Sequence, residues 1–460
     1  VVGGALLPPV QATRVHIGLG NEKAYLGRAG WLFYRPDIDY VTGPAFLDTR
    51  HLRARVLSPA APQPDPRKAI LQFAGQLQER GIRLVLMPTP VKPMVEPERF
   101  AASFKPGAPL LNNPSYASFV AELQAAGVLV FDGGEAMARA KQSAGQAQYL
   151  ATDTHWTPAA MQAVAAQLKE FIEKHAPLAR MPPANYKRIP VKVSNLGDIA
   201  VMMKLPASQT LYPKEEVVIQ QVVRGEPQWR PDPEADVLLL GDSFSNIYSA
   251  NNMGWGEAAG LAEQLSFELQ RPLDAMVRND AGAHATREML SQELARGRNR
   301  LAGKKLVIWQ FAMRELASGD WRTESTPMKL GAARESRFLQ VAEGQARIVT
   351  GIIREATTAP RPGTVTYLDH VIQARLTDLQ AADGRPLDAS DAFIAIYSMR
   401  NQVWTDAARY RVGQKVTLRL RNFDEEHRQS KIGSVKASLL EGDIALETAC
   451  WAEPVGVGGK

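Results

Sequence analysis

Two short segments of the chain carry the residue types that acyl-transfer chemistry needs. Residues 153–156 read Asp-Thr-His-Trp, and residues 241–245 read Gly-Asp-Ser-Phe-Ser. A serine hydroxyl is a weak nucleophile until a base removes its proton, and that base must be held in place by a third group. Because Asp153 and His155 are two residues apart, the carboxylate can hold one imidazole nitrogen while the other nitrogen faces Ser243. Together the two segments predict a Ser-His-Asp catalytic triad.

Each segment also has a purely structural interpretation. An Asp-x-His pair can simply hydrogen-bond a loop, and Asp-Ser after a strand is a common N-cap of a helix. Their occurrence together in one α/β chain favours catalysis, because Ser243 would then stand at a strand-to-helix turn. Backbone N–H groups at the start of the following helix would be available to an oxyanion there.

Between residues 66 and 311 the chain alternates helical patterns with short, apolar runs. Apolar runs of this kind are typical of parallel strands that are buried on both faces. The sequence therefore predicts the α/β class, with a mostly parallel sheet flanked by helices and a ligand site beyond the carboxyl ends of its strands. Residues 1–60, rich in Gly, Pro and Tyr, are expected to be irregular. The expected strands lie within 83–90, 128–132, 235–245, 273–280 and 305–311, and the expected helices are 66–80, 116–127, 157–176, 262–270 and 286–303.

After about residue 330 the chain changes to short β-like runs separated by Pro, Gly and Asp turns. Such runs with turn signals between them predict a small all-β domain of about five strands, either a sandwich or an OB-like barrel. We therefore expect two domains, residues 1–325 and residues 340–460, with a linker at 320–340. The expected strands of the tail are 346–356, 364–379, 392–399, 414–423 and 433–440.

The overall composition excludes several classes of protein. Lysine plus arginine number 54 against 48 acidic residues, and the resulting net charge of +6 is too mild to indicate nucleic acid as a partner. The single cysteine, Cys450, permits no internal disulfide, and the seven histidines are scattered, so we expect neither a metal site nor another cofactor. No apolar run approaches the roughly 18 residues that a membrane span needs. The apolar opening VVGGALLPPV, without methionine, is what a removed export signal or anchor would leave, and equally what an expressed fragment would show.

Residues 241–245 resemble the Gly-Asp-Ser block of the SGNH hydrolase superfamily. In most SGNH enzymes the catalytic Asp and His come last, whereas here Asp-x-His precedes the serine. This permuted order is similar to that of the AlgX/AlgJ-type alginate O-acetyltransferases. The resemblance covers roughly residues 20–320 and rests on GRAGWLFY (27–34), VLMPTPVKP (85–93), YLATDTHWTPAA (149–160), LGDIA (196–200) and KLVIWQFAMREL (305–316).

The resemblance implies a role for each triad position. Ser243 would be the nucleophile that carries the acetyl group, His155 the base and Asp153 its orienting partner. The oxyanion hole would use the backbone N–H of Ser243, the side-chain amide of Asn279 and the backbone N–H of Gly282. For Gly282 a plain turn glycine is the alternative.

Several further residues are candidates for binding the substrate. Trp156, Tyr248 and Trp255 would stack on sugar rings, although aromatic residues near a turn also serve as core. Arg278 would hold an acidic sugar or the developing oxyanion, or else be a solvated arginine at a strand end. Lys92, after the Pro-Thr-Pro strand end, would meet a substrate carboxylate or only solvent.

The β-rich tail resembles AlgX more than AlgJ, because AlgX-type proteins carry a carbohydrate-binding module there, although the cysteine pairs of AlgX are absent. Tyr397, Arg400, Trp404 and Arg411 are expected to be exposed, and a ring beside cationic groups suits an acidic sugar chain. The alternative is that Tyr397 and Trp404 are barrel core and the domain docks a protein partner.

As a whole, the resemblance implies a periplasmic enzyme that moves acetyl groups onto hydroxyls of an exported polysaccharide such as alginate, with a membrane-bound O-acyltransferase as the partner that supplies acetyl. Two alternatives stay open. An SGNH carbohydrate acetylesterase would share the triad and release acetyl to water, and a non-catalytic polysaccharide-binding assembly protein would carry a vestigial triad. The intact Asp153, His155 and Ser243 disfavour the last.

Overall fold

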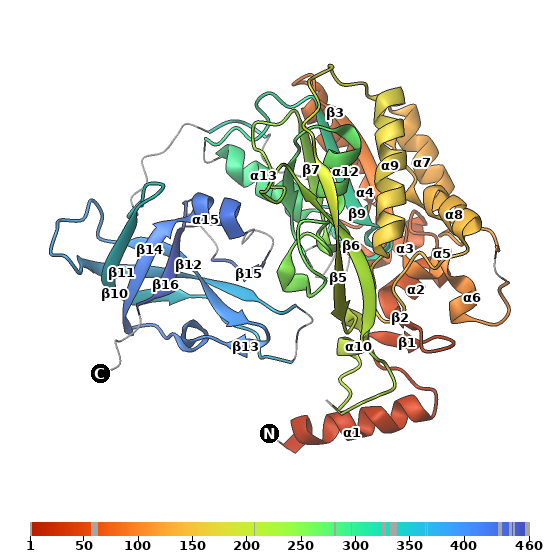
Figure 1. The fold of residues 1–460 in the computed structure, drawn as a ribbon, viewed down its shortest axis with the longest axis horizontal. Coiled ribbons are helices and arrows are strands. Elements are labelled where there is room, and N and C mark those ends of the chain that lie inside the picture. The colour runs from red at the N-terminus through yellow and green to blue at the C-terminus, as the bar shows by residue number, and fades with distance from the viewer. Residues whose placement is uncertain are drawn as a thin grey trace. The chain divides into compact units, whose positions relative to one another are not determined.

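The chain forms two compact units in the computed structural model (Figure 1). The described residues are 2–455 except 57–62, 106, 207, 280–281, 296, 324–327, 332–337, 364, 366, 431–434, 441–443 and 445–446. One unit consists of Val1–Glu288 with Leu301–Pro327, and the other of Met289–Arg300 with Met328–Lys460. The second unit thus includes residues 289–300, which the sequence assigns to the first domain.

The first unit is built on a five-stranded sheet in which every neighbouring pair is parallel. The two apolar runs that form β7 and β9 are buried along their whole length, as the prediction of a sheet covered on both faces requires. Because the strands are parallel, β7, β8 and β9 end at one edge of the sheet. In sheet order the strands are β4 (Leu129–Val130), β3 (Arg83–Thr89), β9 (Leu306–Ala312), β7 (Val237–Gly241) and β8 (Asp274–Val277).

Helices flank this sheet, which confirms the predicted α/β class. The helix before the sheet, α4 (Pro66–Gln78), begins at Asp65, whose side chain accepts a hydrogen bond from Arg67 N. In the same way Thr157 caps α9 (Pro158–His175) through a bond from Ala160 N. The helix expected over 286–303 ends earlier, as α13 (Ala285–Ala295). The other large helices are α7 (Tyr116–Ala125), α8 (Gly133–Ala144) and α12 (Leu261–Leu269).

Several regions of the first unit contain structure that the sequence did not predict, among them α8. The expectation of an irregular segment over residues 1–60 is wrong, because the described part of it forms three helices and a short hairpin. A two-stranded antiparallel ribbon, β5 (Lys187–Asn195) paired with β6 (Glu215–Val223), follows α9. The early elements are α1 (Val2–His16), β1 (Ala24–Leu26), β2 (Leu32–Tyr34), α2 (Arg35–Thr42) and α3 (Thr49–Val56).

The second unit is a closed β-barrel. Its strands pair in the ring β10–β11–β12–β16–β14 and back to β10, so the barrel form of the expected all-β domain is confirmed and the sandwich is excluded. Apolar side chains that alternate along these strands fill the interior, and Cys450 is buried among them. The ring strands are β10 (Ala346–Ala356), β11 (His370–Ala381), β12 (Ala392–Arg400), β14 (Lys415–Asn422) and β16 (Cys450–Pro454).

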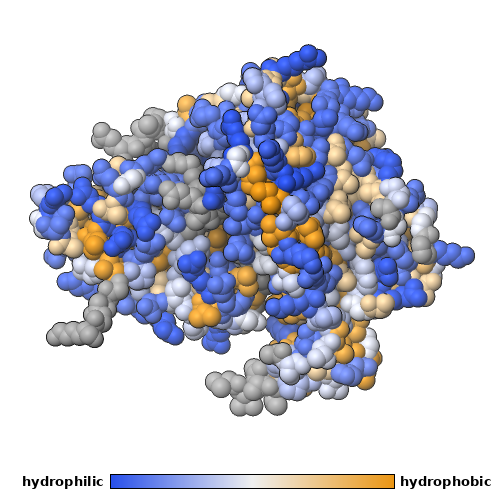
Figure 2. Space-filling view, in the orientation of Figure 1, coloured by the Kyte–Doolittle hydropathy of each residue, from blue (hydrophilic) through white to orange (hydrophobic). Residues whose placement is uncertain are grey.

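A stripe of apolar side chains lies on one face of the first unit (Figure 2). Figure 2 shows a mostly hydrophilic face with an apolar stripe over the region of β5 and β6. Ile189 and Val218, which point to opposite faces of the ribbon, are 46% and 44% exposed, so neither face of the ribbon is fully covered. Among the described residues, no helix has the length and apolar character to cross a membrane.

Candidate active site

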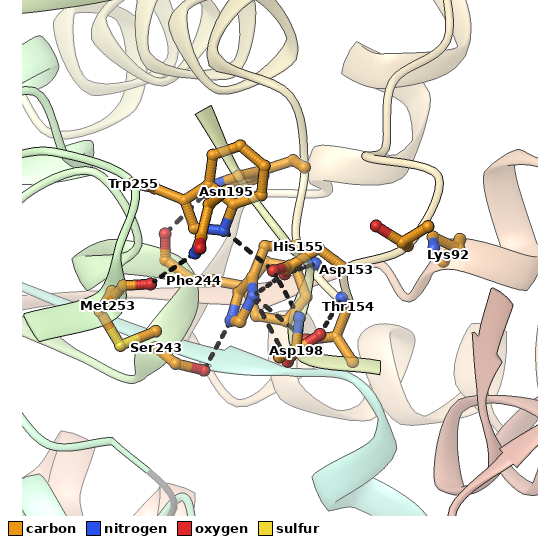
Figure 3. A network of polar contacts seen from close by, with 12 residues as sticks. Lys92, Asp153, Thr154, His155, Asn195, Asp198, Ser243, Phe244, Met253 and Trp255 are labelled. Atoms are coloured by element: carbon orange, nitrogen blue, oxygen red, sulfur yellow. Dashed lines mark hydrogen bonds and ion pairs between the residues drawn. The ribbon is translucent and has the colours of Figure 1, made fainter. Parts of the chain in front are cut away.

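The structure brings the three predicted triad residues together from segments 88 residues apart (Figure 3). Ser243 Oγ lies 2.9 Å from His155 Nε2, and His155 Nδ1 lies 2.6 Å from Asp153 Oδ1. All three side chains are buried. The arrangement is a continuous chain from hydroxyl to imidazole to carboxylate, which is the geometry that activation of a serine requires.

The nucleophile stands on a tightly supported turn. Ser243 is the first residue of the short helix α11 (Ser243–Asn246), directly after β7. Asp242 caps this helix, since its Oδ1 accepts a bond from Phe244 N at 2.9 Å. Gly241 is required by a close approach, because a Cβ there would stand 2.3 Å from Ser245 Oγ.

The neighbouring strand β9 fixes this turn from the side. Gln310 Nε2 donates to Asp242 Oδ1 at 2.9 Å, and the backbone N–H of Ala312 donates to Asp242 Oδ2 at 2.7 Å. Gln310 Oε1 in turn accepts from Asp242 N at 3.0 Å. The polar Asp242 after four buried aliphatic residues is therefore a structural clamp, and its neighbour Ser243 is the residue presented to the base.

The carboxylate of Asp153 is fully occupied by donors. Besides His155, it accepts Trp255 Nε1 and the backbone N–H of Asp198, both at 3.0 Å on Oδ2. Burial alone would raise the pKa of Asp153, but the hydrogen bond and charge of His155 outweigh it and lower the pKa to about 2. Burial acts to lower the pKa of His155, but the hydrogen bond that His155 donates to Asp153, together with the charge of that carboxylate, raises it above its ordinary value of 6.5.

The loop that carries Asp153 and His155 is held by the β5–β6 ribbon. Glu215, the first residue of β6, accepts bonds from Ala151 N at 2.9 Å and from Thr152 N and Oγ1, each at 2.8 Å. Gly197, just after β5, packs so closely that a Cβ would stand 2.3 Å from the Thr152 carbonyl. These contacts join residues about 45 to 64 positions apart in sequence, and the sequence contains no local signal for them.

A second carboxylate, Asp198, lies beside the base at the start of α10 (Asp198–Met202). Its Oδ2 is 3.9 Å from His155 Nδ1, and its two oxygens accept from Thr154 N and Thr154 Oγ1. The ligand atoms of Asp153, His155 and Asp198 lie within 4.8 Å of one another, a spacing that a metal ion could share. Every carboxylate oxygen of Asp153 and Asp198 already accepts a hydrogen bond from an N–H or O–H group. The three residues are therefore arranged as a hydrogen-bonded network rather than as open metal ligands.

The expectation that aromatic side chains here stack on sugar is wrong. Trp156, Tyr248 and Trp255 are completely buried. Tyr248 Oη donates to Trp156 O at 2.7 Å, and Trp156 Nε1 donates to Phe244 O at 3.1 Å, so these two lock the helix of the nucleophile to the segment of the base. Trp255 instead donates its indole N–H to Asp153 Oδ2.

The two residues predicted to complete the oxyanion hole, Asn279 and Gly282, differ in their contacts. Asn279 Oδ1 accepts from Asn246 Nδ2 at 3.2 Å, which ties it to α11, and Asn279 Nδ2 lies 3.1 Å from the sulfur of Met253. Figure 3 shows Met253 beside Ser243. Gly282 has a φ of 77°, and the side chains nearest to it are Glu315 and His284, so its turn conformation accounts for the glycine. The oxyanion roles of Asn279 and Gly282 stay predictions.

The structure places the two cationic residues predicted to bind substrate, Arg278 and Lys92, in different surroundings. Arg278 directly follows β8 and is partly exposed, and burial lowers the pKa of its guanidinium while the charge of Glu288 opposes this, so its contact with substrate stays a prediction. Lys92 is completely buried, and its Nζ donates to Leu32 O at 2.7 Å and to Ala151 O at 3.1 Å. Lys92 therefore contacts neither solvent nor a substrate carboxylate, and burial lowers its pKa to about 8.

Sequence reasoning missed an ion pair at the same edge of the sheet. Arg314 follows β9, and its Nη1 donates to Asp37 Oδ1 at 3.0 Å. Its guanidinium lies 5.7 Å from the ring centroid of Phe244, and its charge acts to lower the pKa of His155. The only available signal was the position of Arg314 directly after a buried strand.

Trp404 lies in the barrel unit, and its substrate role stays a prediction. Its side chain is partly exposed, and its Nε1 donates to Pro360 O at 2.6 Å. Arg400 and Arg411 are exposed as expected, but Tyr397 is half-buried and packs edge-on against Trp451 at 5.1 Å. The expectation that Tyr397 is exposed is therefore wrong, although Arg400 lies over its ring at 4.7 Å.

The chain is similar to a described protein family and to several known proteins. Residues 24–313, which include all three triad positions, match the family described as "SGNH hydrolase-like domain, acetyltransferase AlgX". The chain is 27% identical over 317 residues to the "Probable alginate O-acetylase AlgJ" of Pseudomonas aeruginosa, covering 65% of this chain and 71% of that protein. The protein of the same name from Pseudomonas syringae pv. tomato is 27% identical over 330 residues, covering 70% and 76%. The solved O-acetyltransferase domain of Pseudomonas putida AlgJ is 21% identical, with a TM-score of 0.49 over 66% of this chain and 94% of that one.

Proposed function

Because the chain belongs to the SGNH hydrolase-like family of the acetyltransferase AlgX, we propose that it is an O-acetyltransferase that acts on hydroxyls of an exported, alginate-like polysaccharide. The observation that supports this most directly is the unbroken chain Ser243–His155–Asp153, with 2.9 and 2.6 Å between successive atoms. The names of the AlgJ relatives supply the substrate class.

In the first half-reaction Ser243 takes the acetyl group from a donor ester. His155 Nε2 accepts the hydroxyl proton as Ser243 Oγ attacks the acetyl carbonyl carbon, and the C–O bond to the donor alcohol then breaks. The proton on Nε2 goes to the departing alcohol oxygen. Asp153, whose pKa is about 2, stays ionised and stabilises the imidazolium that forms in between.

In the second half-reaction a sugar hydroxyl takes the place of that alcohol. His155 removes the sugar proton, the sugar oxygen attacks the acetyl carbon, and the bond to Ser243 Oγ breaks as Nε2 returns the proton to it. If water enters instead, the same steps give acetate, which is the acetylesterase reaction. The two activities therefore share the acetyl-enzyme and differ in which acceptor reaches it.

An acidic sugar chain suits the charge at this edge of the sheet. Arg278 and Arg314 follow β8 and β9, so both cations stand at the same carboxyl edge as Ser243. Arg314 forms an ion pair with Asp37, and the charge of Glu288 acts on Arg278. A uronate carboxylate near Arg278 would gain a charge-assisted hydrogen bond.

The proposal includes the setting in which the enzyme acts. A periplasmic location would bring it to the exported polymer, and a membrane-bound O-acyltransferase would supply acetyl. Co-purification of such a membrane protein with this chain from a detergent extract would support the partnership. Full polymer acetylation in cells that lack every membrane-bound O-acyltransferase would contradict it.

The test uses a chromogenic acetyl ester as donor. The protein is incubated with it in the presence of polyuronate oligosaccharides, neutral oligosaccharides or buffer, and mass spectrometry of the sugars counts acetyl groups. We expect acetylated polyuronate with the wild type and none with Ser243→Ala. Acetate release with no acetylated sugar under any condition would favour the acetylesterase. No ester turnover at all would favour a non-catalytic binding protein.

A further inference from the structure

The imidazole of His155 has a second polar neighbour besides Asp153. Thr154 Oγ1 lies 3.1 Å from His155 Nδ1, and the same oxygen lies 2.6 Å from Asp198 Oδ2 (Figure 3). Asp198 Oδ1 also accepts the backbone N–H of Thr154 at 2.7 Å. A chain of contacts thus runs from Asp198 through Thr154 to the nitrogen that faces away from Ser243.

We propose that Asp198, acting through the hydroxyl of Thr154, is a second carboxylate that positions His155 and supports its positive charge during the reaction. This inference rests on the proposed function of the triad. It assigns Asp198 and Thr154 as positioning residues, because they act through the imidazole.

The direction of the hydrogen bonds follows from the proton count. Thr154 has one hydroxyl proton, and the short contact to the carboxylate takes it, because an O–H···O⁻ bond is stronger than one between neutral groups. The lone pairs of Thr154 Oγ1 then accept from His155, so the Nδ1 proton is shared between Asp153 at 2.6 Å and Thr154 at 3.1 Å. With the proton fixed on Nδ1, the Nε2 lone pair is free to accept from Ser243.

The second effect is electrostatic. The distance of 3.9 Å between Asp198 Oδ2 and His155 Nδ1 places a negative charge where it favours the imidazolium, and it raises the pKa of His155 together with Asp153. Burial, and then the charge of Asp153, raise the pKa of Asp198 itself to about 7, so its negative charge and the support that it gives to the imidazolium are fully present only above that pH. The other charged groups near this cluster are Asp37, Lys92, Asp153, Glu215 and Arg314.

Asp198→Asn separates these effects from simple support of the loop. The variant keeps the backbone N–H that Asp153 accepts and an oxygen that Thr154 N can use. Its amide N–H would point at Thr154 Oγ1, so the Thr154 hydroxyl would turn its own proton toward His155 Nδ1 and favour the wrong tautomer. A partly buried negative charge is lost at the same time.

The experiment measures kcat, KM and the pH profile of acetyl-ester turnover for four variants of the full chain. We expect Asp198→Asn and Thr154→Val to lower kcat by about 10- to 100-fold, the scale on which outer-shell partners usually act, with little change in KM. Thr154→Ser keeps the hydroxyl and should retain at least half of kcat. Glu216→Gln, which removes an exposed carboxylate paired with Lys192 on the same ribbon, is the matched control and should behave as wild type.

The pH profile distinguishes positioning from mere structural support. Loss of the Asp198 charge lowers the pKa of His155, so the acid limb of kcat/KM should move to lower pH in Asp198→Asn but not in Glu216→Gln. Histidine-labelled NMR of the wild type should show the neutral imidazole protonated on Nδ1, a result that needs no variant to fold.

Each outcome bears on a different statement. Wild-type kcat and an unmoved acid limb in Asp198→Asn would overturn the inference, as would a Thr154→Ser variant as slow as Thr154→Val or a neutral imidazole protonated on Nε2. If Ser243→Ala instead remained active, the proposed function itself would fail.

Discussion

Replacing Glu215 by glutamine should slow the enzyme although residue 215 takes no part in the chemistry. The glutamate receives three hydrogen bonds from the loop that carries Asp153 and His155, two on Oε1 from Thr152 and one on Oε2 from Ala151 N. A glutamine can keep its oxygen toward Thr152. Its amide nitrogen then faces Ala151 N, so one bond is lost and two donors oppose each other.

The size of the effect follows from that single bond. A hydrogen bond to a charged group contributes about 1.5–3 kcal/mol, and every 1.4 kcal/mol is about tenfold in an equilibrium. Glu215 is only partly buried, so water replaces part of what is lost and the lower end applies. We therefore expect the equilibrium constant for the active position of the loop to fall by roughly tenfold, and kcat to fall by up to that factor.

The assay is steady-state turnover of a chromogenic acetyl ester beside a thermal melt. KM should change little, and the melting temperature should fall by less than about 5 °C, because a single bond between two partly exposed residues, Ala151 and Glu215, is lost. Glu216→Gln, one residue along β6 and exposed, is the control. Unchanged kcat in Glu215→Gln, or an equal loss in Glu216→Gln, would refute the idea that the ribbon holds the base.

Three further outcomes are expected. Ser243→Ala should lose on the order of 10⁴-fold or more in ester turnover with an unchanged melting temperature, and retention of a tenth of the wild-type rate would exclude it as nucleophile. Burial acts to lower the pKa of His155, but the effect of Asp153 is larger and the pKa lies above 6.5. Because only the neutral imidazole can accept the serine proton, kcat/KM should fall as the pH drops through that pKa. A midpoint of the kcat/KM profile at pH 6 or below would contradict the raised pKa. Trp404→Ala should leave small-ester turnover unchanged and reduce acetylation of long polyuronate, which is measured by mass spectrometry; equal polymer acetylation would remove this residue from substrate binding.

The sequence predicts the parts of the fold that have local signals. The parallel strands appear as apolar runs, as in Val237–Gly241, and the all-β tail appears as short strands separated by turn residues, a pattern that leaves a barrel and a sandwich both open. The serine and the Asp-x-His pair were found because each lies in a short segment whose residue types indicate catalysis. Burial of Trp156 and Tyr248 was not predictable in the same way, because an aromatic residue near a turn can pack into the core or face a substrate, and the sequence does not distinguish the two.

The supports of the site were missed for a different reason. Asp198 and Glu215 bond to the base-carrying loop across 44 to 64 positions of sequence, through a ribbon whose strands were not recognised. β5 reads KRIPVKVSN, with alternation but also a proline and several charges, a pattern that also suits an exposed loop. Contacts of this kind depend on how the chain returns in space, which one sequence does not reveal.

The separate supports of nucleophile and base set a minimum for any transplant of this site. Strand β9 clamps the turn of Ser243 through Asp242, whereas the β5–β6 ribbon holds the loop of His155 through Glu215. A graft of residues 149–160 into another hydrolase scaffold would carry the base and its carboxylate but neither holder. Residues 149–223 would have to be transferred as one piece. Shortening the ribbon would lower the turnover of the enzyme without a change to any reacting atom.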